Sequence, residues 1–231
     1  MFGNRIVTIG REFGSGGRLI GQKLAERMGV NCYDKELINL ASKESGLCTE
    51  VFENNDEKPL NSFFYSLVMD TGALGQTFAG YMDAPLNQKV FLAQFETIQR
   101  LAERESCVIV GRCADYALHD YPNTIHVFIS GEMQDKVERV SRYNNISKDK
   151  ALDLIAKSDK KRANYYNYYS NKKWGLASTY DLCINSSLTG VDGAVDVIMK
   201  FIEVKEALQR RNEIESMDED YKENSNLFDP D

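Results

Sequence analysis

The residues best suited to chemistry lie in a glycine-rich stretch near the N-terminus, GREFGSGGR from Gly10 to Arg18. It follows a short apolar, β-branched run at residues 5–9 and precedes a helical pattern that begins at Gly17. Glycines between a strand and a helix let the backbone curl so that several N–H groups point at one anion. Unless it is only a tight strand-to-helix turn, the stretch predicts a phosphate cradle in which consecutive main-chain amides converge on one anion. The residues expected to take part are Gly10, Arg11, Gly14, Ser15, Gly16, Gly17 and Arg18.

Alternating strands and helices must hold this loop in place. Apolar runs bounded by turn residues predict strands at 5–9, 31–33, 107–110, 124–129 and 181–184. Helical spacing of apolar residues predicts helices at 17–28, 35–45, around 91–102, up to about 143 from an N-cap at Ser130, beyond a cap at Ser147, and at 191–208. This order predicts an α/β fold: a three-layer α/β/α sandwich with a five-stranded parallel sheet. Its ligands are expected beyond the carboxyl ends of the strands.

A chain of 231 residues suits one such domain. We expect the domain to span residues 1–208, with a helical or irregular insertion at 46–83 and a helical lid at 145–175. Residues 209–231 are expected to form an acidic, partly disordered tail.

Charge is distributed unevenly along the chain, whose net charge is −7. Eight acidic residues and one Lys lie between Glu213 and Asp231, so the acidity belongs to the tail. Between Lys148 and Lys173, eight basic residues accompany three acidic ones, which predicts that something anionic is handled there. No recognisable nucleic-acid-binding module accompanies this basic stretch, and the acidic tail opposes general polyanion binding, so nucleic acid is not an expected partner.

Composition argues against several other classes of site. Five scattered cysteines without C-x-x-C spacing and two histidines leave little material for a metal site or a Ser/His/Asp triad. We expect reduced, mostly buried thiols. No apolar run approaches the roughly 20 residues that cross a bilayer, and the N-terminus shows no secretory signal, so we expect a cytoplasmic protein without a membrane partner.

Two further candidates, Asp34 and Arg112, each follow directly on a predicted strand, as Gly10 does. A guanidinium grips phosphate with two parallel hydrogen bonds. Arg112 by itself could be a surface ion-pair residue, but its place after a strand and a glycine favours the site. The Asp34 carboxylate could orient an acceptor hydroxyl, accept its proton or hold Mg²⁺ through water. It could also cap the helix that follows, and the two roles can coexist.

At these motifs the chain resembles the cytidylate kinase-like family, a branch of the P-loop nucleoside monophosphate kinases. The resemblance covers most of residues 5–205 through VTIGREFGSGGRLIG, YDKEL, VIVGRCADY, KKRANYYNYY and YDLCINSS. It implies a P-loop kinase fold, ATP as phosphate donor, Mg²⁺, a cytidylate-type acceptor and an arginine-bearing lid. It also places Asp34 on the acceptor side and assigns acceptor-phosphate binding to Arg112.

The chain departs from this family at the usual lysine. Aligned without gaps on a P-loop, G-x-x-x-x-G-K-[ST], the sequence puts Arg11 at the first glycine, Gly17 at the lysine and Leu19 at a threonine. We expect Arg18 to supply the missing positive charge, and Arg11 could reach from the other side. The aspartate that follows the family's arginine is Cys113 here, and Asp115 is a remote substitute, so the metal ligands stay open.

The basic stretch is interpreted through the same resemblance. Lys161 and Arg162 fit a lid that closes over phosphates, whereas a solvated helix face is the alternative. The neighbouring aromatic residues could form a base-stacking wall, pack the lid on the core, or make a homo-oligomer contact. Residues 185–187 fall where such kinases often place an adenine-binding loop. The aromatic residues in question are Tyr165, Tyr166, Tyr168, Tyr169 and Trp174.

The sequence as a whole therefore predicts an ATP-dependent phosphotransferase acting on a nucleoside monophosphate or similar acceptor. Its expected catalytic residues are Arg18, Asp34 and Arg162, and its expected acceptor-binding residues are Asp34, Arg112, Lys161 and Arg162. Two alternatives stay open: a non-catalytic nucleotide-binding or regulatory protein that lost the lysine, and a kinase of a small metabolite.

Overall fold

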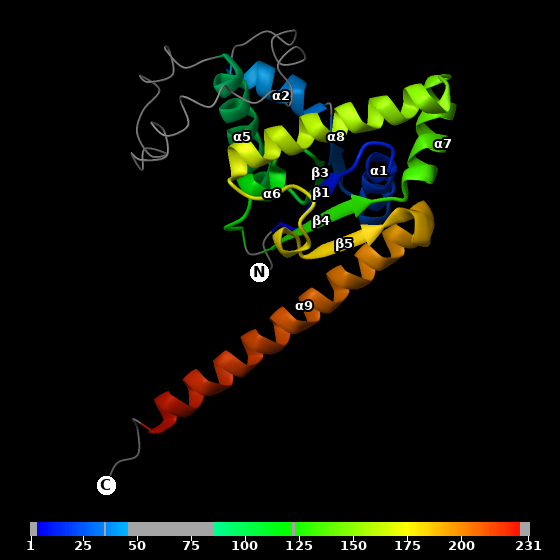
Figure 1. The fold of residues 1–231 in the computed structure, drawn as a ribbon. Helices are drawn as coiled ribbons and strands as arrows, with labels where there is room; N and C mark the ends of the chain where they lie inside the picture. The colour runs from blue at the N-terminus through cyan, green and yellow to red at the C-terminus, as the bar shows by residue number, and fades with distance from the viewer. Residues whose placement is uncertain (1–3, 35, 46–85, 122, 227–231) are drawn as a thin grey trace.

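A computed structural model describes residues 4–34, 36–45, 86–121 and 123–226 of the chain (Figure 1). The insertion expected at 46–83, and Cys48 within it, lie outside the described residues. The strands are β1 (Ile6–Arg11), β2 (Asn31–Tyr33), β3 (Cys107–Val110), β4 (Thr124–Ser130) and β5 (Leu182–Asn185). The helices are α1 (Gly17–Met28), α2 (Glu36–Ser45), α5 (Leu86–Arg104), α6 (Ala114–Ala117), α7 (Met133–Asn144), α8 (Lys148–Ser170) and α9 (Ser186–Asn226), with a short 3-10 helix at Ala177–Thr179.

The five strands form one parallel sheet in the order β2-β3-β1-β4-β5. The first strand lies in the middle, where β3 and β4 pair with it on either side. Because all strands run the same way, the residues that follow β1, β2 and β3 meet at one edge of the sheet. That edge receives the glycine loop, Asp34 and Arg112, as the sequence predicted.

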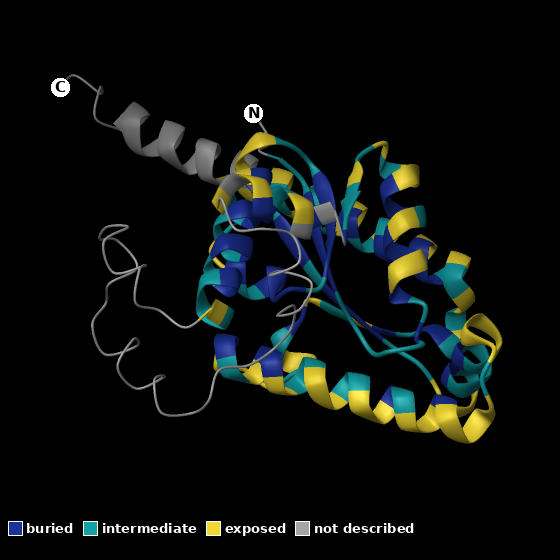
Figure 2. Ribbon diagram, turned by 90° about the horizontal axis from the view of Figure 1, so that it is seen from above, coloured by how far each residue is buried: buried dark blue, intermediate teal, exposed yellow. Residues whose placement is uncertain are grey.

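Helices cover both faces of the sheet, which confirms the predicted three layers. Alternate residues of each strand point to opposite faces, so Val7 and Ile9 pack on one side and Ile6 on the other. The first side is covered by α1 and α9, and the second by α2, α5 and α6. Figure 2 shows the buried residues concentrated in the central strands and on the inner sides of the helices.

Several predicted boundaries differ from the structure: Gly10 and Arg11, expected in the loop, belong to β1, and the ends of two helices also change. Ser130 does not cap α7: it ends β4, and its hydroxyl donates to the carbonyl of Ile184 at 3.3 Å, while Glu132 takes the N-cap position. The last helix, expected to end near residue 208, continues to Asn226 and extends away from the sheet (Figure 1). Residues 209–226 contain neither Gly nor Pro, so nothing in their local chemistry stops a helix there.

The helix that carries the basic stretch begins as expected. Ser147 caps α8 by accepting a hydrogen bond from the amide of Lys150 at 3.4 Å. Among the described helices, none combines the length and the apolarity needed to cross a membrane. Four of the five cysteines are described, and all four are free thiols: Cys107 and Cys113 are buried, Cys32 is half-buried and Cys183 is exposed.

His126 links the fold to pH. It sits in β4 opposite Thr8 of β1, and its Nδ1 lies 2.8 Å from the Thr8 hydroxyl. Burial lowers the pKa of His126 from 6.5 to about 4, although the Asp181 carboxylate opposes this shift. The unfolded chain therefore binds more protons between these two values, and stability falls as the pH drops from about 6.5 towards 4.

We expect the free energy of unfolding to fall by about 2 kcal/mol more between pH 7 and pH 5 in the wild type than in His126→Gln. Urea unfolding of both proteins at the two pH values measures this difference. His119→Gln, which changes an exposed histidine, is the control and should keep the wild-type pH dependence. Equal pH dependence in all three proteins would show that His126 is not responsible.

Candidate active site

The glycine loop leaves β1 at Arg11 and enters α1 at Gly17. Gly14 and Gly16 have φ angles of 81° and 83°, a left-handed conformation that glycine adopts without strain. Gly14 is also covered by α7, because a Cβ there would lie 2.8 Å from Cγ2 of Val140 and 3.1 Å from the carbonyl oxygen of Lys136. The glycine spacing therefore serves both the turn of the loop and its contact with α7.

The amides of the loop do not all point at one anion, which corrects the sequence expectation. The N–H of Glu12 donates to the carbonyl of Ile129 at 3.0 Å, and the N–H of Ser15 donates to the carbonyl of Glu12 at 3.3 Å. The N–H of Phe13 donates to Oδ1 of Asp159 at 2.6 Å. Ser15 therefore does not offer its amide as predicted, because the loop uses it to close its own turn.

A smaller set of amides stays open to a ligand. In the part of the chain that the structure describes, no hydrogen bond takes up the N–H groups of Gly14, Gly16 and Arg18. The N–H of Gly17 makes only a long contact of 3.4 Å with the Ser15 hydroxyl. Unsatisfied amides at the start of a helix favour an anion, so the phosphate cradle contracts to residues 14 and 16–18.

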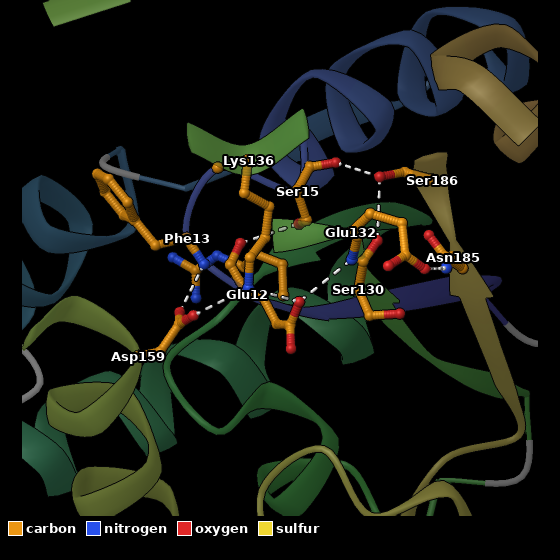
Figure 3. A network of polar contacts seen from close by, with 12 residues as sticks. Glu12, Phe13, Ser15, Ser130, Glu132, Lys136, Asp159, Asn185 and Ser186 are labelled. Atoms are coloured by element: carbon orange, nitrogen blue, oxygen red, sulfur yellow. Dashed lines mark hydrogen bonds and ion pairs between the residues drawn. The ribbon is translucent and has the colours of Figure 1, made fainter. Parts of the chain in front are cut away.

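Two serine hydroxyls donate hydrogen bonds to backbone carbonyls of the loop. The hydroxyl of Ser15 donates to the carbonyl of Glu12 at 2.9 Å. The hydroxyl of Ser186, at the start of α9, lies 2.6 Å from the carbonyl of Ser15 and 3.0 Å from that of Ser130 (Figure 3). Residues 185–187, expected to form an adenine-binding loop, thus contact the glycine loop through Ser186.

A buried lysine beside the loop escaped the sequence analysis. Lys136 of α7 has a side chain only 4% exposed, and its Nζ lies 2.9 Å from Glu12 and 3.4 Å from Asp159 (Figure 3). Glu12 also accepts the N–H of Gly131 at 3.1 Å. Burial raises the pKa of Asp159, while the Phe13 amide and Lys136 act to lower it. The sequence held one sign of such a lysine: a loop expected to bind anions contains a carboxylate, Glu12, for which no cationic partner had been predicted.

Helix α8 contacts the loop through the predicted arginine. Nη1 of Arg162 donates to the carbonyl of Arg11 at 3.2 Å, and its guanidinium lies 5.4 Å from the ring centre of Phe13. Arg139 of α7, which was not predicted, donates to the carbonyl of Gly14. Lys161 is exposed to solvent beside Arg162 and is not drawn into these contacts.

On the neighbouring strands, three predicted residues meet. Nε of Arg18 and Nη1 of Arg112 each lie 2.8 Å from an oxygen of Asp34. The side chains of Arg112 and Asp34 are 4% and 11% exposed, so Arg112 is not the surface residue that the alternative described. Left-handed backbone at Gly111, Arg112 and Cys113, with φ of 81°, 55° and 54°, forms the tight turn that carries Arg112. Arg18, expected at the phosphates of ATP, is paired instead with Asp34.

The aromatic residues of α8 pack the helix on the core. Tyr165, Tyr166 and Tyr169 are buried, and the Tyr169 ring stacks on Phe91 of α5 at 3.8 Å between centres. The Tyr166 hydroxyl lies 2.5 Å from the buried carboxylate of Asp115, whose pKa burial raises. These three tyrosines therefore do not form a base-stacking wall, and Asp115 is hydrogen-bonded to Tyr166.

Comparisons with known proteins agree with this geometry. The sequence pattern of the cytidylate kinase-like family matches residues 6–188. This chain belongs to that family. The cytidylate kinase of Archaeoglobus fulgidus is 26% identical over 152 residues, which make up 62% of this chain and 77% of that protein. A crystal structure of an uncharacterized protein from Eubacterium ventriosum has a TM-score of 0.65 and 34% identity, covering 87% of this chain and 99% of the other.

Membership of the cytidylate kinase-like family confirms the fold predicted from the sequence. Together with the loop at the end of β1, it supports a phosphotransferase of the kinase type that uses a nucleotide. Within the described residues, no group of three or more His, Cys, Asp or Glu side chains is placed to hold a metal ion.

Proposed function

We propose that this protein transfers the γ-phosphoryl group of ATP to a nucleoside monophosphate or a similar small acceptor in the cytoplasm. The observation that carries the proposal is the meeting of two sites at one sheet edge. The open amides of the loop form the first, and the Arg18–Asp34–Arg112 cluster forms the second. A donor with a terminal phosphate fits the first site, and an acceptor that carries both a phosphate and a hydroxyl fits the second.

Each group then has a chemical task. The N–H groups of Gly14, Gly16 and Arg18 bind the phosphates of ATP, and Arg112 grips the phosphate of the acceptor. With a nucleoside monophosphate, an oxygen of the acceptor phosphate attacks the γ-phosphorus of ATP and ADP leaves, while Asp34 orients a hydroxyl of the acceptor. Asp34 receives a proton only where the acceptor reacts through a hydroxyl. This requires the acceptor phosphate to displace Asp34 from one of its two arginines. Arg162, already on the loop, neutralises charge that builds up during transfer, and we retain Lys161 as a second cation for that step.

We expect Mg²⁺ to bind together with ATP. Magnesium in such sites is often held by one or two carboxylates together with substrate phosphates. Bound to ATP, Mg²⁺ supplies charge neutralisation at the phosphates.

The test is formation of ADP from ATP and Mg²⁺ in the presence of CMP and a panel of other nucleoside monophosphates. We expect acceptor-dependent ADP formation, and a loss of at least about 100-fold in kcat/KM for Arg112→Lys, because an ammonium cannot reproduce the two parallel bonds of a guanidinium. ATP binding without ADP formation for any acceptor would contradict the proposal.

ATP binding without ADP formation would favour a non-catalytic nucleotide-binding protein. One observation supports this alternative: Gly17 stands at the position of the P-loop lysine. ADP formation with hydroxylated metabolites but not with nucleotides would favour a small-metabolite kinase instead.

A further inference from the structure

A side chain at Gly17, where an ordinary P-loop has its lysine, would collide with Arg11. A Cβ at Gly17 would lie 2.6 Å from Cβ of Arg11, 3.2 Å from its Cγ and 3.3 Å from Cβ of Ile129. Contacts of 2.6 Å between carbon atoms do not occur in packed proteins, because they fall far inside van der Waals separation. Any side chain at Gly17 therefore competes with the side chain of Arg11 for the same space.

The guanidinium of Arg11 ends at a second glycine. A Cβ at Gly111 would lie 2.7 Å from Cζ of Arg11 and 3.0 Å from its Nη2. Gly111 follows β3, directly before Arg112, and its N–H donates to the carbonyl of Ile9 at 3.0 Å. The Arg11 side chain thus runs from the end of β1, across Gly17, to the turn that holds the acceptor-side arginine.

The backbone fixes the position from which the Arg11 side chain starts. Arg11 is the last residue of β1 and is in register with Ile129 of β4. Its carbonyl accepts the hydrogen bond from Arg162. From this fixed start, the close approaches at Gly17 and Gly111 place the side chain along the loop and its charged end against the turn that carries Arg112.

We propose that Arg11 supplies the phosphate-binding cation that lysine provides in an ordinary P-loop, reaching the terminal phosphates of ATP from the strand side of the loop. This inference rests on the proposed transfer of a phosphoryl group from ATP. Arg18, the residue that sequence reasoning favoured for this role, points its Nε at Asp34 instead. Relative to G-x-x-x-x-G-K-[ST], the glycine and the cation have exchanged places between positions 11 and 17.

The exchange can be reversed by mutation. Arg11→Gly removes the cation, Gly17→Lys adds one against the Arg11 side chain, and the double variant recreates the ordinary order of glycine and lysine. In the double variant, the two Arg11 atoms nearest to the new Cβ are gone. Of the three nearest atoms, Cβ of Ile129 at 3.3 Å remains, and a shift of a few tenths of an ångström relieves that contact. Arg11→Met keeps an unbranched side chain and shows whether loss of charge alone is responsible.

We expect Arg11→Gly and Arg11→Met to lower ATP affinity by at least about 10-fold and kcat/KM by at least about 100-fold. AMP, which has no β- or γ-phosphate, should bind within about 2-fold of the wild type. Gly17→Lys alone should not improve on the wild type in either measurement. The double variant should recover at least about 10-fold of the kcat/KM lost in Arg11→Gly, which a purely structural role of Arg11 does not predict.

Isothermal titration with ATP and AMP, ADP formation and thermal melting complete the test. Arg27→Met removes an arginine that pairs with Asp196 on the surface, and should match the wild type throughout. Arg11→Met that melts like the wild type and keeps its ATP affinity overturns the inference, as does a wild type that binds no ATP. If the wild type makes no ADP but its preference for ATP over AMP depends on Arg11, the proposed function fails and the role of Arg11 stands.

Discussion

Asp34→Asn should lower the free energy of unfolding by about 3 kcal/mol, because it removes the carboxylate that lies beside the buried guanidinium of Arg112. The side chain of Arg112 is 4% exposed and its Nη1 lies 2.8 Å from Asp34. Nη1 also lies 3.3 Å from the carbonyl of Val110, which carries no charge to offset the guanidinium. Arg18, the other partner of Asp34, is 48% exposed and reaches water easily, so its loss of a partner adds little.

Urea unfolding at pH 7 measures this effect, with Asp196→Asn as a matched control. Asp196 pairs with Arg27 on the surface, and its removal should cost less than about 0.5 kcal/mol. The double variant Asp34→Asn/Arg112→Met should lose less stability than the sum of the two single changes, because the two side chains interact directly. Similar losses in Asp34→Asn and Asp196→Asn would show that the buried pair is not needed for folding.

Gly14→Ala should lower the free energy of unfolding by about 2–3 kcal/mol and weaken ATP binding by at least about 10-fold. The φ of 81° places a new Cβ in a strained conformation, and that Cβ would lie 2.8 Å from Cγ2 of Val140. Relief requires the loop to move away from α7. Such a shift carries the open amides of Gly14 and Gly16 out of line with the phosphates.

Gly29→Ala separates strain from crowding. Gly29 ends α1 with a φ of 68°, and no atom of the described residues is recorded within 4 Å of the position that its Cβ would take. This control should therefore lose only about 1 kcal/mol, the strain of the left-handed backbone. Gly14→Ala/Val140→Ala should bind ATP better than Gly14→Ala, since the crowding atom is gone. An equal loss in Gly14→Ala and Gly29→Ala would show that the contact with α7 is unimportant.

Local chemistry determined the elements of this protein and their order. The patterns that predict these elements are short-range: the β-branched runs at β1 and β3, the apolar spacing of α1 and the glycine after it. Such a pattern favours its strand or helix independently of where the element lies in the fold. Parallel strands then bring the residues after β1, β2 and β3 to one edge. Gly14, Gly16, Asp34 and Arg112 were therefore predictable as neighbours from the sequence.

Only the tertiary structure decided which of these groups face a ligand. Lys136 and Glu12 are 124 residues apart, and Asp159 and Phe13 are 146 apart, so no local pattern records that they pair. The same holds for the Arg11 side chain, whose path across Gly17 to Gly111 depends on how β1 and β3 lie together. The sequence alone thus determined the sheet, the glycine loop and the resemblance to the cytidylate kinase-like family. The division of charge among Arg11, Arg18 and Lys136 arose from packing, because ion pairs depend on distances in space, which sequence separation does not record.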